Sequence, residues 1–381
     1  MTREIRLLVL NCEFPPIGGG AATATWHLLK ELSALPVKTT LVTAAKGGRF
    51  TVKEFAPNCR IHYLPIRKSH LQYWSTRELV AYGVAAIGHM KRLMRDGNRF
   101  DVCHAFFTVP SGAAAMLYRK RMPYIVSLRG SDVPGFSGRF LWLYRSIGPL
   151  FKAIWQRADA VVANSESLAQ LARQTAGEIE IGVIPNGVDV ERFSPGERRE
   201  RGRTILVVAR LVPRKDIETA IRAAALLKGE FGGVKLMVVG DGPQAGELQN
   251  LSQSLALDGT VEFSRYVPRE RIGDVYRRAD VFMMTSKREG MSNTVLEAIA
   301  SGLPLVVSRE ALAGIDVPEA QVVPVGDAEG AAAAAARWFR DEGARRQAAE
   351  ASRAASMNYT WGRMAERYYE LYCKVVESRG A

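Results

Sequence analysis

Short apolar runs alternate with amphipathic stretches along the whole chain, and loops rich in glycine, proline or polar residues join the two. The runs contain few polar residues, as do strands that are buried on both faces of a parallel sheet. In the first half these strand-like runs cover 5–11, 38–43, 60–64, 101–107, 123–128, 159–163 and 179–184. In the second half they cover 204–209, 234–240, 260–263, 280–285 and 304–308. A repeated strand–helix rhythm of this kind predicts an α/β fold.

The amphipathic stretches between the runs have the periodicity of helices. They cover 21–35, 75–94, 216–229, 244–256, 270–278, 292–301 and 361–376, with a helix-favouring alanine run at 331–336. Strands and helices in this alternation predict doubly wound parallel sheets.

The chain has 381 residues, which is too long for one ordinary core, so we expect two domains. The polar, arginine-rich tract 194–203 reads as a linker. The predicted domains are therefore 1–193 and 204–358.

The composition, 47% hydrophobic and 24% charged, is that of a globular protein. No run of eighteen apolar residues occurs, and the first four residues lead directly into a strand, so we expect a cytoplasmic protein that does not span a membrane. Four scattered cysteines without a Cys-x-x-Cys pattern argue against both disulfides and zinc. We expect no metal site.

Positive charge is concentrated in the first half. Residues 1–200 hold 27 Lys+Arg against 16 Asp+Glu, whereas residues 201–381 hold 25 against 23. Such a basic surface suits an anionic membrane or an acidic or phosphorylated substrate, and nucleic acid is the weakest alternative because no nucleic-acid motif accompanies it.

Several of these cations lie just before the helical stretch 75–94, at its start or at its end. They are Arg67, Lys68, Arg77, Lys91, Arg92 and Arg95. The interpretation we favour is surface solvation and compensation of the helix dipole. Contact with a membrane surface is the alternative, which Leu71, Tyr73 and Trp74 support.

The stretch 285–301 carries the strongest candidate chemistry. A loop with Gly290 follows an apolar strand and leads into a helix, and ligands bind at such strand ends in open α/β sheets. Helix N-termini attract anions, and the carboxylates of Glu289 and Glu297 suit a polyhydroxyl ligand. The alternative is a capping box formed by Thr294 and Glu297.

Two further loops carry candidate phosphate contacts. Arg210 and Lys215 follow the first strand of the second half and suit a diphosphate, and ordinary surface solvation is the alternative. The glycine loop 18–20 lies between a strand and a helix, and the turn that begins at Gly240 has the chemistry of an ordinary connection.

Polar residues also stand at the ends of two strands in the first half. They are His104, Arg129 and Asp132, and their position makes them candidates for an active site. A structural histidine and an Arg129–Asp132 ion pair are the alternatives.

Five segments together resemble the retaining glycosyltransferases of family 4. They are Gly18–Gly20, Ile184–Asp189, Ala209–Lys215, Val239–Pro243 and Glu289–Ala298. The resemblance spans residues 5 to about 376 and implies the GT-B architecture, two Rossmann-like domains that face each other across a cleft. It implies an acceptor on the first domain, a nucleotide-sugar donor on the second, and a C-terminal helix, 361–376, that packs back on the first.

The resemblance also implies roles for individual residues. Arg210 and Lys215 would bind the diphosphate of the donor and stabilise the charge on the leaving nucleotide. Glu297 would hold the ribose hydroxyls, and Glu289 those of the transferred sugar. The other residues of the implied donor site are Gly18, Gly19, Gly20, Asn186, Gly240, Gly290, Met291 and Ser292. The chain has no Asp-x-Asp motif, which is consistent with metal-independent transfer, and the implied substrate is a UDP- or GDP-linked sugar with no cofactor.

The chain departs from the family pattern at two places. Arg129 stands where the family commonly has the histidine of a His-Gly pair, and an arginine cannot act as a general base near neutral pH. We keep Arg129 as a candidate that binds a hydroxyl or an acidic acceptor, with His104 and Asp132 on the acceptor side. The segment 263–266 lacks a glycine that is usual near the nucleobase in the family, so the identity of the nucleobase is left open.

The expected function is retaining transfer of a hexose-type sugar from an NDP-sugar to a hydroxyl acceptor that is lipid-linked or anionic. We expect it in the assembly of cell-surface polysaccharide, lipopolysaccharide or glycolipid, at the inner face of the cell membrane. The alternatives are a nucleotide-sugar epimerase of the same fold and a non-catalytic protein that binds sugar nucleotides or membranes. The sugar, the linkage and the oligomeric state stay open.

Overall fold

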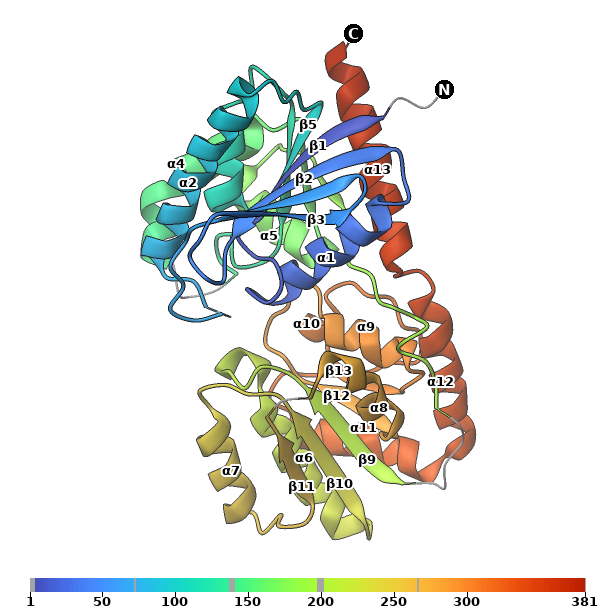
Figure 1. The fold of residues 1–381 in the computed structure, drawn as a ribbon. Helices are drawn as coiled ribbons and strands as arrows, with labels where there is room; N and C mark the ends of the chain where they lie inside the picture. The colour runs from blue at the N-terminus through green and yellow to red at the C-terminus, as the bar shows by residue number, and fades with distance from the viewer. Residues whose placement is uncertain (1–3, 72, 137–140, 197–201, 266, 381) are drawn as a thin grey trace. The chain divides into compact units, whose positions relative to one another are not determined.

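The protein consists of two compact units (Figure 1). The computed structural model describes residues 4–380 except 72, 137–140, 197–201 and 266, and only the backbone of 141–147, 176, 269 and 380. One unit comprises Met1–Asn186 with Trp361–Ala381, and the other comprises Gly187–Thr360. Each has its own hydrophobic core. The predicted α/β class, with two parallel-sheet units, is confirmed.

The segment 187–193, assigned from sequence to the first domain, packs in the second unit. The backbone N–H of Val188 donates to Tyr359 O at 2.7 Å, and Val188 and Phe193 are buried in the second core. Half of the predicted linker, 197–201, lies outside the described residues.

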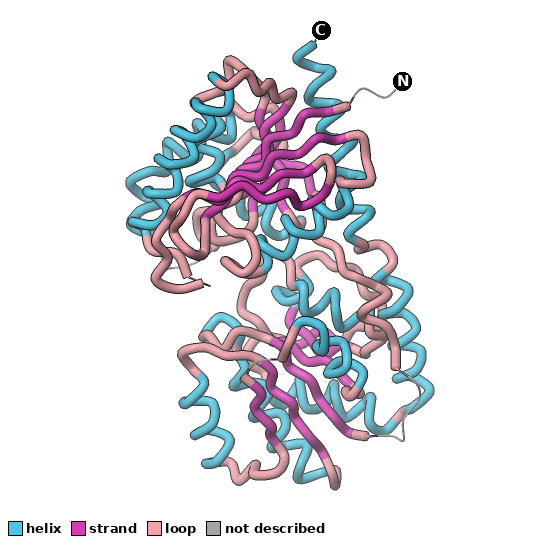
Figure 2. Tube along the Cα trace, viewed as in Figure 1, coloured by secondary structure: helices cyan, strands magenta, loops and turns pink. Residues whose placement is uncertain are grey.

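The first unit is built on an eight-stranded sheet with the order β3-β4-β2-β1-β5-β6-β7-β8 (Figure 2). Its strands are β1 (Ile5–Leu10), β2 (Val37–Ala44), β3 (Thr51–Ala56), β4 (Cys59–Leu64), β5 (Val102–Phe106), β6 (Tyr124–Leu128), β7 (Ala160–Ala163) and β8 (Ile181–Val183). All neighbours pair in parallel except β3 with β4. The hydrophobic pattern did not predict β3, because this edge strand is largely exposed and lacks an apolar run.

Helices pack against this sheet, as Figure 1 shows for α1, α2 and α13. The helical segments are α1 (Gly20–Leu32), α2 (Thr76–Arg95), a π-type turn (Thr108–Gly112), α3 (Ala113–Met116), α4 (Leu141–Gln156), α5 (Glu166–Ala176) and α13 (Trp361–Gly380). Within the part of the chain that the structure describes, no helix has the length and apolar character needed to cross a membrane. All four cysteines are free.

The second unit has a six-stranded parallel sheet with the order β11-β10-β9-β12-β13-β14. Its strands are β9 (Arg203–Val208), β10 (Val234–Val239), β11 (Val261–Ser264), β12 (Val281–Met284), β13 (Leu305–Ser308) and β14 (Gln321–Val323). Its α-helices are α6 (Ile217–Glu230), α7 (Ala245–Ser254), α8 (Ile272–Arg277), α9 (Asn293–Ala300), α10 (Arg309–Leu312), α11 (Ala328–Arg340) and α12 (Glu342–Ser356). Two 3₁₀ turns cover Pro213–Lys215 and Arg269–Arg271. The hydrophobic pattern did not predict α12, because its buried face consists of small residues, Ala348, Ser352 and Ser356.

The C-terminal helix α13 belongs to the first unit, although it follows the second in sequence. It packs against α1 and β5 (Figure 1). Its buried residues are Trp361, Met364, Ala365, Tyr368, Tyr372 and Val375. The ring of Trp361 stacks on His27 of α1 with centroids 4.4 Å apart. The helix therefore completes the core of the first unit.

The residues before α2 that we considered for membrane contact are partly buried in the fold. Ser75 and Glu78 form a capping box, in which each side chain accepts a hydrogen bond from the other residue's backbone N–H. Lys68 lies 3.0 Å from Glu78 and 3.7 Å above the ring of Trp74, and the side chains of Lys68 and Trp74 are buried. These two residues are thus part of the fold, and only Leu71 and Tyr73 of the proposed apolar set are exposed.

Two histidines join β4 to α2. Nδ1 of His62 lies 2.8 Å from Nε2 of His89, so one ring donates to the other and the pair holds a single bridging proton. Burial, and then the proximity of His89 and Arg60, lowers the pKa of His62 to about 4. Burial and then Arg92 also lower the pKa of His89, against the opposing effect of Asp96.

This pair predicts a loss of stability in mild acid. The unfolded chain takes up protons near pH 6.5, whereas the folded His62 takes one up only near pH 4, so the unfolded state binds more protons between these values. The unfolding free energy should therefore fall as the pH drops from 6.5 to 4. His62→Gln should flatten this dependence in thermal unfolding curves, whereas the same change at the exposed His70 should leave it unaltered. Equal slopes for wild type and His62→Gln would contradict the prediction.

Candidate functional site

The central cluster of the second unit joins the loops that follow β9 and β12. These strands pair directly, so their carboxyl ends lie side by side. Lys215, in the 3₁₀ turn after β9, places its Nζ 2.8 Å from Oε1 of Glu289, in the loop after β12. Arg214 lies 3.1 Å from the same oxygen. The structure thus brings together two residues that sequence analysis assigned to one site, and it adds Arg214, which that analysis missed.

The cluster carries a net positive charge, and two of its three members are buried, whereas Arg214 is half-buried. Lys215 is 9% exposed and Glu289 is 8% exposed. Burial lowers the pKa of Lys215, and the attraction of Glu289 offsets this only in part. Burial raises the pKa of Glu289, but Lys215 and then Arg214 outweigh it, so that pKa lies below its usual value. Two cations therefore face one carboxylate, an arrangement that attracts a further anion such as a phosphate.

Arg210 stands apart from these ion pairs. It is exposed, just beyond the end of β9, and its charge contributes to the lowered pKa of Lys215. Glu289 was expected to face sugar hydroxyls, but its Oε1 instead lies between Lys215 and Arg214. This carboxylate thus helps to hold buried Lys215 and half-buried Arg214 in place.

Hydrogen bonds cross-link the two loops. The backbone N–H of Lys287 donates to Arg214 O at 2.9 Å, and the Arg214 guanidinium donates to Arg288 O. The hydroxyl of Thr285 donates to Asp216 O at 3.0 Å. Because these bonds run in both directions between the loops, the cluster is preorganised.

The glycines after β10 support the same region by close packing. A Cβ on Gly240, whose φ is +145°, would lie 1.8 Å from Ala209 O, and one on Gly242 would lie 2.3 Å from Leu211 O. The backbone N–H of Leu211 donates to Asp241 O at 3.0 Å. Gly240 therefore has a structural reason to be glycine, since it lets this turn lie against the backbone that carries Arg210.

The capping box considered for α9 does not form. The N-cap is Ser292, whose hydroxyl accepts from the backbone N–H of Val295, so Glu297 lies beyond the first turn. Glu297 instead accepts a hydrogen bond of 2.7 Å from the hydroxyl of Tyr276 in α8. Gly290 and half-buried Met291 precede the cap. The carboxylate of Glu297 is thus held in position by Tyr276, a residue that was not identified from the sequence.

The glycine loop of the first unit encloses a carboxylate of the same chain. Gly18 has a φ of +98°, and a Cβ there would lie 2.5 Å from Oε2 of Glu13. The backbone N–H of Gly19, the N-cap of α1, donates to the same oxygen at 3.3 Å, and Gly20 begins the helix. Glu13 therefore stands where an anionic ligand was expected to approach the loop.

Arg129, directly after β6, lies in a polar cluster with α13. Its NH1 donates to Oδ1 of Asn186 at 2.8 Å and its NH2 donates to the hydroxyl of Tyr368 at 3.1 Å. Its guanidinium lies 4.4 Å above the ring of Phe106. Asn186, assigned from the resemblance to the donor, is thus a partner of Arg129.

The other two residues predicted on the acceptor side have all their polar atoms engaged. His104 is fully buried, with Nδ1 2.7 Å from the hydroxyl of Tyr372 and Nε2 2.6 Å from that of Ser127. Burial and then Arg129 lower the pKa of His104 well below its usual value, so the ring is neutral. Contrary to the prediction, His104 has no ring nitrogen left for an acceptor.

Asp132 organises its own loop. Its Oδ1 accepts from the backbone N–H groups of Arg129 and Gly130, and its Oδ2 accepts from the backbone and the hydroxyl of Thr108. The predicted side-chain ion pair with Arg129 is therefore replaced by a backbone contact, and the carboxylate is saturated.

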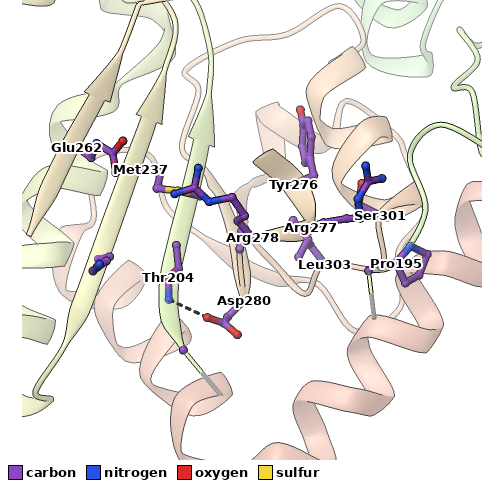
Figure 3. Close-up of a pocket in the computed structure, with 15 residues that line it drawn as sticks. Pro195, Thr204, Met237, Glu262, Tyr276, Arg277, Arg278, Asp280, Ser301 and Leu303 are labelled. Atoms are coloured by element: carbon purple, nitrogen blue, oxygen red, sulfur yellow. Dashed lines mark hydrogen bonds between the residues drawn. The ribbon is translucent and has the colours of Figure 1, made fainter. Parts of the chain in front are cut away.

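A cavity of about 410 Å³ lies toward the amino ends of the strands of the second sheet, away from the cluster at their carboxyl ends (Figure 3). Thr204, Asp280 and Leu303 line it near the starts of β9, β12 and β13, and Asp280 accepts a hydrogen bond of 2.9 Å from Thr204 N. Residues 197–201, between the lining residues Gly196 and Gly202, lie outside the described residues, so we assign no ligand to this cavity.

Comparison with known proteins agrees with this architecture. The family models "Glycosyltransferase Family 4" and "Glycosyl transferases group 1" match residues 18–192 and 189–355. The chain is 26% identical over 311 residues to a phosphatidylinositol N-acetylglucosaminyltransferase subunit from Arabidopsis thaliana, a match that covers 80% of this chain and 68% of that protein. It is 28% identical over 341 residues to the lipopolysaccharide core biosynthesis glycosyltransferase LpsE of Rhizobium meliloti, covering 87% and 89%.

The solved structures show the same fold. Sucrose-phosphate synthase from Thermosynechococcus elongatus matches with a TM-score of 0.83 at 21% identity, covering 98% of this chain and 100% of that one. At this identity the likeness concerns the fold alone. The two family matches, which together span residues 18–355, place the chain in glycosyltransferase family 4, and the two sheets and the solved structures show the GT-B fold.

Proposed function

We propose that this protein is a retaining glycosyltransferase that moves a sugar from an NDP-sugar to a hydroxyl acceptor. The observation that carries the proposal is the cluster of buried Lys215 and Glu289 with half-buried Arg214 at the carboxyl ends of β9 and β12. A net positive, preorganised site of this kind binds a diphosphate and stabilises the charge that grows on it as the sugar leaves.

The roles follow from the contacts of each residue. Lys215 and Arg214 neutralise the diphosphate, and exposed Arg210 attracts it. The amides of Gly290, Met291 and Ser292 at the start of α9 contribute further donors. Glu297, held by Tyr276, accepts hydrogen bonds from the ribose hydroxyls.

Glu289 is not the nucleophile in this proposal. Its ion pairs with Lys215 and Arg214 lower its pKa and its reactivity, so a covalent glycosyl intermediate on this carboxylate is disfavoured. We propose instead that the acceptor attacks on the face that the nucleotide leaves, and that the departing phosphate takes the acceptor's proton. Retention of configuration follows from that geometry.

The same cations support transfer without a metal ion. Metal-dependent glycosyltransferases commonly hold the diphosphate through a metal bound to Asp-x-Asp, a motif that this sequence lacks. Lys215, Arg214 and Arg210 provide positive charge at the corresponding position.

We propose that the acceptor belongs to glycolipid or cell-surface polysaccharide assembly at the inner face of the membrane. Relatives named for N-acetylglucosaminyl transfer to phosphatidylinositol and for lipopolysaccharide core biosynthesis support this assignment. The basic first half, with exposed Arg77, Lys91, Arg92 and Arg95 on α2, is suited to an anionic surface.

The test is a panel of UDP- and GDP-sugars, with nucleotide release and donor binding as readouts. Tight binding of one donor, followed by acceptor-dependent release, is expected. Failure of every nucleotide sugar to bind would refute the proposal, and donor turnover without transfer to any acceptor would favour an epimerase.

Glu297 provides a residue-level prediction. Glu297→Gln should weaken donor binding about 10-fold, since it removes a charged acceptor of hydroxyl hydrogen bonds worth roughly 1.4 kcal/mol. Tyr276→Phe removes only the hydrogen bond that orients this carboxylate, so its effect should be smaller. Isothermal titration with the bound nucleotide measures both. Unchanged affinity in Glu297→Gln would contradict the assigned role, and Glu270→Gln, in the 3₁₀ turn before α8, is the control.

A further inference from the structure

Arg129 and Asn164 lie next to each other at one edge of the first sheet. The parallel strands β6 and β7 pair in register up to Leu128 and Ala163. Arg129 and Asn164 are the residues that follow these two partners. Both therefore stand at the carboxyl edge of the sheet, where open α/β sheets bind ligands.

The guanidinium of Arg129 is held in position but retains unused donors. Asn186 and Tyr368 each accept one of its N–H groups, and Phe106 supports its face. Its Nε is buried and has no hydrogen-bond partner among the described residues. The carboxylate on its own loop, Asp132, accepts its hydrogen bonds from the backbone N–H groups of Arg129 and Gly130 and from Thr108, and not from this guanidinium. The result is a fixed positive charge with donors to spare.

Asn164 adds an unused acceptor. Its side chain is buried, with 5% of the residue exposed, and its Oδ1 has no partner among the described residues. A buried amide oxygen without a donor is unusual in a folded protein. A ligand that satisfies both residues must offer an acidic group to the arginine and a hydroxyl to the asparagine.

We infer that Arg129 and Asn164 bind the acidic group and a nearby hydroxyl of an anionic carbohydrate, either a uronic acid or a sugar phosphate. The planar arginine fork matches a carboxylate or a phosphate, for which a histidine in the same place would offer a single donor. The inference rests on the proposed function, since it names the substrate class of that reaction. It makes Arg129 a specificity residue, whose partners Tyr368 and Asn186 position it.

The direct test is binding of glucuronate, glucose 6-phosphate and glucose to the full chain, measured by ligand-observed NMR. Wild type should bind the two anions at least about 10-fold more tightly than glucose, a difference that a charged hydrogen-bonded contact supplies. Arg129→Met should reduce this preference to near unity, and Arg129→Lys should restore part of it. Arg92→Met, which removes an exposed cation from α2 of the same unit, is the matched control.

Asn164→Asp tests the second residue without a change in size. A carboxylate beside Arg129 would neutralise it and repel an anion, so anion binding should fall while glucose binding is retained. This variant also carries the test if Arg129→Met fails to fold. An equal affinity of wild type for glucose and glucuronate would overturn the inference, as would an anion preference that survives both Arg129→Met and Asn164→Asp.

Matched substrates separate the two sources of the acidic group. Transfer rates are compared for glucoside and glucuronide acceptors, and for UDP-glucose and UDP-glucuronate donors. If Arg129→Met removes a preference for the glucuronide acceptor over the glucoside, the acidic group belongs to the acceptor. If it removes a preference for UDP-glucuronate over UDP-glucose, the acidic group belongs to the transferred sugar. UDP and GDP binding, which reports on Lys215, should be unchanged in Arg129→Met. If no nucleotide binds to wild type while the anion preference holds, the proposed transfer fails and this site stands.

Discussion

Replacement of Lys215 by methionine is expected to reduce kcat/KM for the nucleotide-sugar donor by at least about 100-fold, close to 2.7 kcal/mol of transition-state stabilisation. The ammonium is buried, so water cannot replace it when negative charge develops on the leaving diphosphate. Steady-state nucleotide release with varied donor concentration measures the effect. Lys235→Met, an exposed lysine at the start of β10, should remain within about twofold of wild type.

The partner of Lys215 makes a stability control necessary. Glu289→Ala leaves two cations near a buried site without their carboxylate, and loss of one member of a buried pair typically costs about 3–5 kcal/mol. Lys215→Met leaves Glu289 paired with Arg214, so it should be folded at assay temperature, which a thermal melt verifies. A folded Lys215→Met protein with near-normal kcat/KM would remove the central support of the proposed mechanism.

A chain that stops after Thr360 is expected to lose the fold of the first unit. It lacks α13, whose buried side chains include Trp361, Met364, Tyr368, Tyr372 and Val375. At about 1.5–3 kcal/mol for each large apolar side chain, their loss is comparable with the about 5–15 kcal/mol that stabilises a whole domain. Limited proteolysis followed by mass spectrometry should show rapid cleavage within 4–186 and protection of 203–356.

A second truncation provides the control. A chain that stops after Val376 keeps all of these buried residues and should resist proteolysis like the full chain. Equal protease resistance of the first unit in the chain that ends at Thr360 would show that α13 is dispensable for its core.

Sequence patterns predicted most of the fold because the strands of both sheets are covered on both faces. Runs such as Ile5–Leu10 are almost wholly buried, so composition alone marks them. The elements missed from sequence include α4, α5, β14, β3 and α12. At β3, pairing at an exposed edge needs no apolar run, and at α12, small residues form the buried face. In both cases tertiary contacts, and not local hydrophobicity, define the element.

Helix capping shows more clearly where prediction from local sequence fails. The Ser/Thr-x-x-Glu spacing occurs at Ser75–Glu78, where the box forms, and at Thr294–Glu297, where it does not. Helix α9 begins at Asn293 and its N-cap is Ser292, two residues before Thr294, the cap that the spacing suggests. Glu297 therefore lies beyond the first turn and accepts its hydrogen bond from Tyr276. Local sequence allows both starts, so only the packed structure distinguishes a cap from a candidate ligand-binding carboxylate.

The contacts of Arg129 in the first unit could not be predicted from sequence, because one of its partners is distant in the chain. The resemblance marked Arg129 and Asn186, but Tyr368 is 239 residues away from Arg129, and no spacing rule connects them. The sequence did contain a signal, since Tyr368 and Tyr372 are one helical turn apart on the face of α13 that is buried. Buried hydroxyls need polar partners, which they find in Ser127, His104 and Arg129.

The place of α13 in the chain has a consequence for biosynthesis. The ribosome releases residues 4–186 first, yet the hydroxyl that orients Arg129 arrives only with residues 361–381, after the entire second unit has been made. A nascent polypeptide that has not reached residue 368 therefore lacks the hydroxyl that accepts a hydrogen bond from Arg129. The proposed Arg129 site can therefore be completed only after the second unit has been synthesised.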